Sequence, residues 1–137
     1  MAEQITEKGD NSDTFSLINK TKGKLPRLPF VEIKNTTLGK DYNLSLVFIG
    51  ETKSKNLNRI YREKNKVANV LSFPLSKKEG EIFICSKKAK KEATLFKNTY
   101  YQFVGFLFIH GLLHLKGEQH GATMEKQERL LLKRFTS

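Results

Sequence analysis

The sequence has little of several residue types, and each shortage excludes a class of protein. Cys85 is its one cysteine, so no intramolecular disulfide can form, and a lone thiol inside the apolar run IFIC is predicted to be a core residue. No stretch approaches the roughly 18 uninterrupted apolar residues of a membrane-spanning helix. The polar N-terminus MAEQITEKGDNSD lacks the basic and apolar segments of a signal peptide. We therefore expect a cytoplasmic protein without a membrane partner.

Acidic residues are also scarce. The chain has 25 Lys and Arg residues against 14 Asp and Glu residues, a formal net charge of +11. This excess predicts a polyanionic partner, and nucleic acid is the first candidate because Lys and Arg replace the counterions of its phosphates. An anionic membrane surface is the weaker alternative. The length of 137 residues, 38% of them hydrophobic, fits one compact domain with a single active site.

Hydrophobic periodicity predicts a mixture of strands and helices. Residues 1–13 have no such pattern and are expected to form a flexible tail, which leaves residues 14–137 as the domain. Strands are predicted at 14–19, 44–49, 69–75 and 81–85. Because proline cannot donate to a sheet ladder, Pro74 should end its strand or lie on a sheet edge. Helices are predicted at 30–38, 52–64, 86–97, 100–115 and 123–134.

Three of these helices carry specific expectations. In the helix at 52–64, Leu57, Ile60 and Tyr61 share one face, which makes the helix basic and amphipathic. In the helix at 86–97, the residues turned inward should be Ala89, Ala93 and Phe96. The last helix should begin with Thr123 as its N-cap and supply the apolar residues 130–132.

All three histidines of the chain lie in one short string, HGLLHLKGEQH. Residues four apart on a helix share a face, so His110 and His114 can converge on one ion. Gly117 should end the helix and let the chain turn back to bring His120 to the same point. Three nitrogen ligands with a free fourth position are typical of a catalytic zinc site. Histidines packed in the core and a purely structural metal site are the alternatives.

The spacing HxxxHxxGxxH is shared with the metzincin peptidases, which carry HExxHxxGxxH. In those enzymes the glutamate after the first histidine is the general base, and this chain has Gly111 at that position. Water activation must then come from the metal, which can lower the pKa of bound water to about 7, or from a group elsewhere. The substitution weakens the peptidase interpretation without excluding it.

Three segments together resemble the YbeY family of bacterial metal-dependent endoribonucleases, the ribosomal RNA maturation factors. They are LNRIYREKNKVANVLSFP at 57–74, GEIFI at 80–84, and the histidine string, which matches HGxLHLxGxDH at its three histidines and both glycines. The segments and their spacing cover roughly residues 44–120. Three positions depart from the family pattern: Gln119 replaces its aspartate, Glu81 replaces the acid of Gly-Asp-Ile, and Ala68-Asn69 replaces Thr-Asp/Asn.

The resemblance implies an α+β fold: a single domain with a small mixed β-sheet flanked by helices, and a metal site on a long core helix and the turn after it. It implies one metal ion per chain, Zn²⁺ or another divalent transition metal, held by His110, His114 and His120. The family's conserved arginine falls on Arg62, whose planar guanidinium suits phosphate oxygens. We predict Arg62 and His114 as catalytic residues. The predicted substrate-binding residues are Arg62, Lys64, Lys66, Asn69 and Ser72.

The resemblance implies a single-strand-specific, zinc-dependent endoribonuclease that acts in ribosomal RNA maturation and ribosome quality control. Metal-activated water would attack a phosphodiester, and the partners would be single-stranded or ribosomal RNA and the ribosome. Bases of a single strand are commonly held by aromatic stacking, for which Tyr61 and Phe73 are the candidates, with core packing favoured for Phe73. The alternatives are a metzincin-like metalloendopeptidase and a non-catalytic RNA-binding ribosome-assembly factor. Oligomeric state is left open.

Overall fold

The strands assemble into one mixed sheet in the computed structural model, which describes residues 5–6 and 13–136. Along the sheet their order is β1-β2-β3-β5-β4. β2, β3 and β5 run parallel, and the edge strands β1 and β4 are antiparallel to their neighbours. The strands span Ile5–Thr6 (β1), Phe15–Asn19 (β2), Asn43–Ile49 (β3), Val70–Ser76 (β4) and Glu79–Cys85 (β5).

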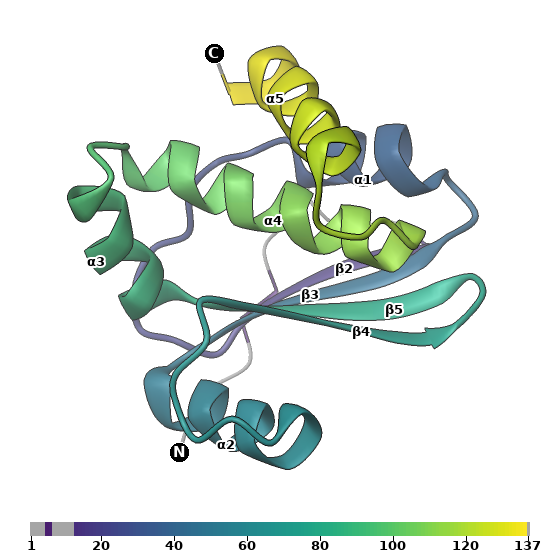
Figure 1. The fold of residues 1–137 in the computed structure, drawn as a ribbon. Helices are drawn as coiled ribbons and strands as arrows, with labels where there is room; N and C mark the ends of the chain where they lie inside the picture. The colour runs from purple at the N-terminus through teal and green to yellow at the C-terminus, as the bar shows by residue number, and fades with distance from the viewer. Residues whose placement is uncertain (1–4, 7–12, 137) are drawn as a thin grey trace.

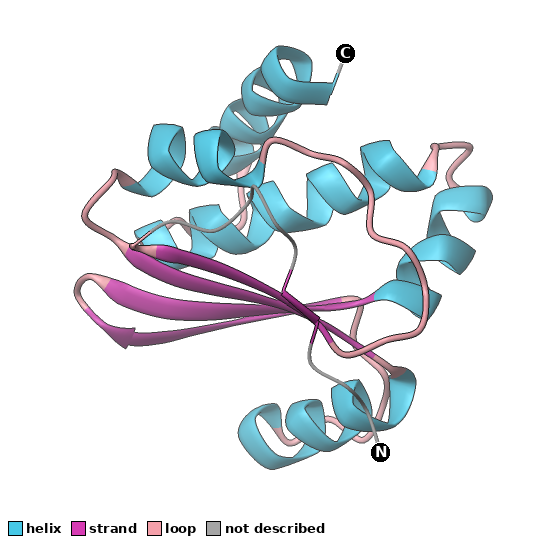
Figure 2. Cartoon of the chain, turned by 180° about the vertical axis from the view of Figure 1, so that it is seen from behind, coloured by secondary structure: helices cyan, strands magenta, loops and turns pink. Residues whose placement is uncertain are grey.

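Five helices cover the two faces of this sheet unequally. They are Phe30–Leu38 (α1), Glu51–Arg62 (α2), Ser86–Leu95 (α3), Tyr100–Lys116 (α4) and Ala122–Thr136 (α5). Four of them lie on one side, with α4 crossing the sheet, whereas α2 lies alone on the other side (Figures 1 and 2). This arrangement confirms the predicted α+β fold. β1 falls inside the segment expected to be a tail, and the rest of that segment up to residue 12 lies outside the described residues.

The two faces of the sheet differ because side chains alternate along each strand. On β3, Leu44, Leu46 and Phe48 are fully buried in the main core. There Phe30 of α1 contacts Phe108 of α4 edge to face, with ring centroids 5.1 Å apart. Side chains in the alternate register face α2 instead. Two sequence expectations are confirmed: the Cys85 thiol is buried, and Pro74 lies in an edge strand.

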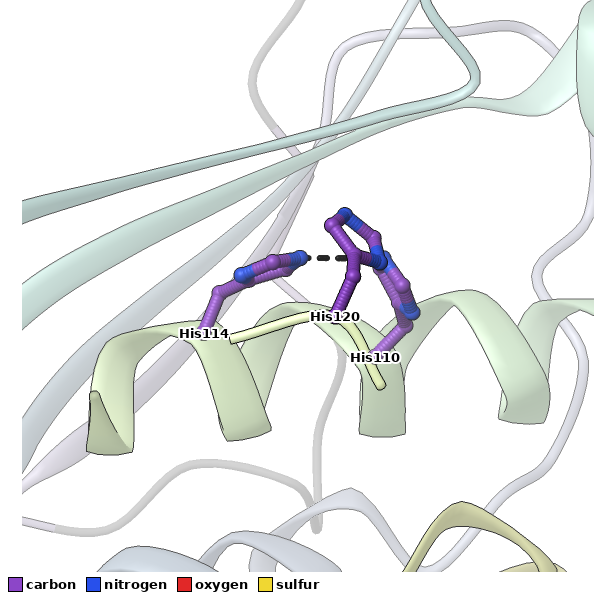
Figure 3. A group of neighbouring side chains, drawn as sticks. All are labelled: His110, His114 and His120. Carbon is purple, nitrogen blue, oxygen red and sulfur yellow. Dashed lines mark hydrogen bonds between the residues drawn. The ribbon is translucent and has the colours of Figure 1, made fainter. Parts of the chain in front are cut away.

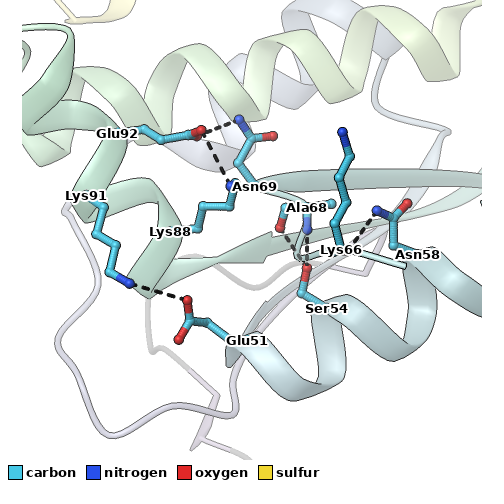
Figure 4. Close-up of polar contacts among 9 residues, drawn as sticks. All are labelled: Glu51, Ser54, Asn58, Lys66, Ala68, Asn69, Lys88, Lys91 and Glu92. Atoms are coloured by element: carbon cyan, nitrogen blue, oxygen red, sulfur yellow. Dashed lines mark hydrogen bonds and ion pairs between the residues drawn. The ribbon is translucent and has the colours of Figure 1, made fainter. Parts of the chain in front are cut away.

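The inner face of α2 is polar, although its sequence is amphipathic. Its buried residues are Ser54 and Asn58, whereas Ile60 and Tyr61 are 58% and 66% exposed. The Ser54 hydroxyl donates to the carbonyl of Ala68 (2.7 Å), and the Asn58 amide donates to the carbonyl of Lys66 (2.9 Å) (Figure 4). The helix thus turns Ser54 and Asn58 to the backbone of the loop that follows it. For this reason its most buried residues are polar and not the apolar ones that the sequence pattern indicated.

Helix ends account for two further differences from the sequence prediction. Ala89 and Ala93 are buried as expected, but α3 ends at Leu95, so Phe96 leaves the helical face and is 64% exposed. It stacks on Phe103 of α4, with centroids 5.9 Å apart. The prediction of Thr123 as an N-cap was wrong, because α5 already begins at Ala122. Among the apolar residues at 130–132, Leu130 is exposed.

Candidate metal centre

Helix α4 owes its fixed position to well-formed ends. At its start, the Thr99 hydroxyl accepts from the backbone N–H of Gln102, whose side chain accepts in return from the N–H of Thr99. At its end, Gly117 adopts a left-handed conformation with φ of 103°, which suits glycine. Its N–H bonds to the carbonyl of His114. The chain therefore reverses three residues after His114, as the sequence predicted.

This reversal brings His120 back to the histidines of the helix. One ligand nitrogen from each of His110, His114 and His120 lies within 4.8 Å of the other two. The imidazole rings face one another, with centroids 4.6 to 5.1 Å apart (Figure 3). His110 and His114 are half-buried, and His120 is exposed. The open side of the cluster therefore lies next to His120.

The donor set and the spacing of two of its nitrogens fit a transition-metal ion. The Nε2 atoms of His110 and His114 are 3.1 Å apart. Two nitrogens bound tetrahedrally to one zinc ion at about 2.0–2.1 Å would lie about 3.3 Å from each other. Burial lowers the pKa of His114, and the fields of His110 and His120 lower it further. A lowered pKa favours the neutral imidazole, the form that binds a metal.

A carboxylate that sequence reasoning missed lies behind the cluster. The Nδ1 atom of His110 is 2.6 Å from the Oε2 atom of Glu128, which is buried although it belongs to the C-terminal helix α5. A proton on Nδ1 donates to this carboxylate, so the Nε2 lone pair of His110 points to the other histidines. The sequence feature that could have revealed Glu128 is its spacing of four residues from Met124, which places both on the buried face of α5.

A pocket of about 430 Å³ opens in front of the histidines, and its opposite wall comes from α2 and β4. Arg62 lies at the end of α2, and Asn69 and Ser72 belong to the segment that leads into and along β4. Among the described residues that line this pocket, none is acidic. The pocket therefore offers three imidazoles and a guanidinium, a combination suited to an anionic group.

Two of the predicted substrate residues lie outside this pocket. Lys64 and Lys66 line a neighbouring pocket of about 290 Å³, which shares Arg62 and Asn69 with the first. There the Asn69 amide donates to Glu92 (2.8 Å), a carboxylate that also pairs with Lys88 (3.8 Å) (Figure 4). The structure thus places Arg62, Asn69 and Ser72 in one pocket with the histidines, and Lys64 and Lys66 in the neighbouring pocket.

Packing explains the residue that distinguishes the histidine string from the metzincin pattern. Gly111 is buried against β5, and a Cβ atom at this position would lie 3.1 Å from Cδ1 of Ile82. A side chain at this position would therefore begin against Ile82 of the sheet, although the glycine itself lines the pocket with the histidines. The exposed Gln119, which stands where the family pattern has aspartate, lies before His120 in the turn after α4.

Comparison with known proteins places these features in one family. The family described as Endoribonuclease YbeY matches residues 11–136. The chain belongs to the YbeY family. A YbeY endoribonuclease of Staphylococcus epidermidis is 31% identical over 69% of this chain and 70% of its own length. One from Thermodesulfovibrio yellowstonii is 36% identical over 77% of this chain and 67% of its own.

A solved structure agrees with this assignment. The solution structure of TM1509 from Thermotoga maritima matches with a TM-score of 0.57 at 28% identity, over 74% of this chain and 73% of the other. YbeY proteins are metal-dependent, and the histidine cluster supplies three ligand atoms for an ion. The prediction of an enzyme of the endoribonuclease class is thus confirmed at the level of the family. Among the described residues, no helix is long and apolar enough to cross a membrane.

Proposed function

We propose that this YbeY protein is a cytoplasmic, zinc-dependent endoribonuclease that cleaves single-stranded RNA during ribosomal RNA maturation and ribosome quality control. The observation that carries the proposal is the pocket in which three imidazoles face Arg62 and no described lining residue is acidic. A carboxylate-free pocket accepts a phosphodiester without like-charge repulsion. The names of its relatives, Endoribonuclease YbeY, support RNA as the substrate.

The residues of the pocket have separate tasks in this proposal. His110, His114 and His120 would hold the ion, which when bound would supply Lewis-acid chemistry and lower the pKa of a water molecule. Arg62 donates to the phosphoryl oxygens and stabilises the charge that develops on them. Asn69 and Ser72 hydrogen-bond the nucleotide next to the scissile phosphate, and Lys64 and Lys66 hold a flanking phosphate in the neighbouring pocket.

The peptidase alternative lacks a comparable observation. A general base placed as in the metzincins would have to replace Gly111, where a Cβ atom would already lie 3.1 Å from Cδ1 of Ile82. An assembly factor would use the same basic surface to bind RNA but would not cleave it. Cleavage itself therefore separates the three functions.

The test is a cleavage assay on the zinc-loaded protein with labelled single-stranded RNA, duplex RNA and casein. We expect cleavage of the single strand alone. Arg62→Gln should lower kcat/KM by about 10²–10³-fold, the loss that follows removal of one charge-stabilising donor. His114→Ala should abolish turnover and weaken metal binding.

Arg59→Gln is the matched control, because Arg59 is an exposed arginine in the same last turn of α2 that lines none of the pockets described above. Its kcat/KM should stay near that of the unmodified protein. RNA binding without cleavage would favour the assembly factor, and cleavage of casein alone would favour the peptidase. Equal loss in Arg59→Gln and Arg62→Gln would contradict the role assigned to Arg62.

A further inference from the structure

A second groove lies on the opposite side of β4 from the metal pocket. Its volume is about 590 Å³, within the range of small-molecule sites, and it runs between α2 and the exposed part of the sheet. Tyr61, Phe73 and Phe83 form a continuous aromatic row there. The ring centroids of Tyr61 and Phe73 are 5.4 Å apart, and those of Phe73 and Phe83 are 5.9 Å apart.

Two elements place this groove immediately beside the metal pocket. On α2, Tyr61 lines the groove and the next residue, Arg62, lines the pocket. On β4, Ser72 lines the pocket, Phe73 lines the groove, and Pro74 contributes to both. Alternation along an edge strand explains the second case, because successive side chains point to opposite faces. A chain that leaves the pocket around the edge of β4 therefore enters the groove.

The groove also has the charges that suit one kind of occupant. Lys20 and Lys53 lie at its sides, where they can contact the phosphates of a strand. Glu81, half-buried on β5, is the acidic residue among those that line it, and its carboxylate would repel a phosphate but can accept a hydrogen bond from an exocyclic amine. Tyr61 is 66% exposed, so its ring face is available to a planar ligand.

We propose that this groove is a nucleobase subsite, in which Tyr61 and Phe73 stack a base of the single-stranded RNA whose neighbouring phosphodiester lies in the metal pocket. This inference rests on the proposed function and adds to it a second point of contact beyond the cleavage site. Stacking grips any base, because every base has a π-face, and Glu81 favours bases that carry an amino group, cytosine, adenine and guanine, over uracil.

The test compares three variants on two substrates, a single-stranded RNA long enough to reach both sites and a dinucleotide. Tyr61→Leu removes the ring and should raise KM for the long RNA about tenfold or more. Tyr61→Phe keeps the ring and should restore the value of the unmodified protein. Phe96→Leu is the control, because Phe96 is equally exposed but belongs to the α3–α4 corner. Its KM for the long RNA should not change.

The outcomes separate this inference from the proposed function. If the unmodified protein neither binds nor cleaves RNA, both are wrong. If it cleaves RNA but Tyr61→Leu behaves like Phe96→Leu, only the base subsite is wrong. An equal rise of KM for the dinucleotide would mean that Tyr61 acts through the adjacent Arg62, and would also overturn the subsite. A dimer that Tyr61→Leu dissociates, with RNA binding unchanged, would assign the groove to a second copy of the chain instead.

A second measurement covers the case in which Tyr61→Leu disturbs the fold. Cytidine monophosphate, titrated into the unmodified protein, should shift the ring proton resonances of Tyr61 and Phe73 in the NMR spectrum. Uridine monophosphate should do so more weakly because it lacks the amine for Glu81. If neither nucleotide shifts the ring resonances of Tyr61 and Phe73, the proposal is wrong.

Discussion

The orientation of one imidazole depends on a single carboxylate. Glu128 accepts from Nδ1 of His110 at 2.6 Å, which leaves Nε2 as the nitrogen of His110 that would bind an ion. Glu128→Gln keeps the size of the side chain but removes its charge, and loss of such a partner typically lowers metal affinity about 10–100-fold. Zinc affinity measured by competition with a chromophoric chelator should fall by that amount. Glu125→Gln, an exposed substitution on the same helix, is the control, and equal affinities in the two variants would exclude this role for Glu128.

Gly111 gives a second prediction at the residue scale. Gly111→Glu would recreate the metzincin sequence but start the new side chain against the buried Ile82, with its Cβ atom 3.1 Å from Cδ1 of that residue. Burying an uncompensated charge should lower the free energy of unfolding by about 3–5 kcal/mol, measured by urea denaturation. Gly111→Ala should stay within about 1 kcal/mol, because the end of the Ile82 side chain can shift and alanine favours a helix. A stable Gly111→Glu variant that cleaves casein would refute this explanation.

At the scale of elements, the close approach of β5 to the end of α4 holds the metal centre over the sheet. A Cβ atom on Gly80 would lie 2.5 Å from the Tyr42 hydroxyl and 3.0 Å from Leu115, the residue after His114. Gly80→Ala should therefore lower the free energy of unfolding by about 1–3 kcal/mol, measured by urea denaturation. In Gly23→Ala the new methyl group meets ordinary van der Waals contacts, so this control should change stability by less than about 0.5 kcal/mol. Similar losses in both variants would show that close packing at Gly80 is not the cause.

The helices show which features of the fold and site could be predicted from the sequence and which could not. The long apolar segment at 100–115 predicted the course of α4 closely, and the glycine after it predicted the return of His120. Spacing along one helix cannot reveal a partner on another, so Glu128 was missed although it lies next to His110. The burial of Ser54 and Asn58 could not be foreseen for a related reason. Their partners are carbonyl and N–H groups of a loop whose path depends on the whole fold.

At the scale of the whole molecule, the net charge of +11 comes partly from lysines that line pockets and partly from lysines exposed elsewhere on the surface. Lys64 and Lys66 line the pocket next to the metal centre, whereas Lys22 and Lys24 are exposed in the loop before α1 and line none of the described pockets. Neutralising either pair changes the total charge equally. Only the first pair, however, should alter the number of phosphates that the protein contacts in its RNA complex.

The salt dependence of RNA binding measures that number directly. For single strands, the slope of log K against log salt concentration changes by about 0.7 for each phosphate neutralised. Lys64→Gln/Lys66→Gln should therefore make the slope shallower by about 1.4, whereas Lys22→Gln/Lys24→Gln should leave it nearly unchanged. Fluorescence anisotropy with labelled single-stranded RNA over a range of salt concentrations provides the slopes. If both double variants lose the same amount, the RNA responds to overall charge rather than to the pocket, and the flanking-phosphate role of Lys64 and Lys66 is wrong.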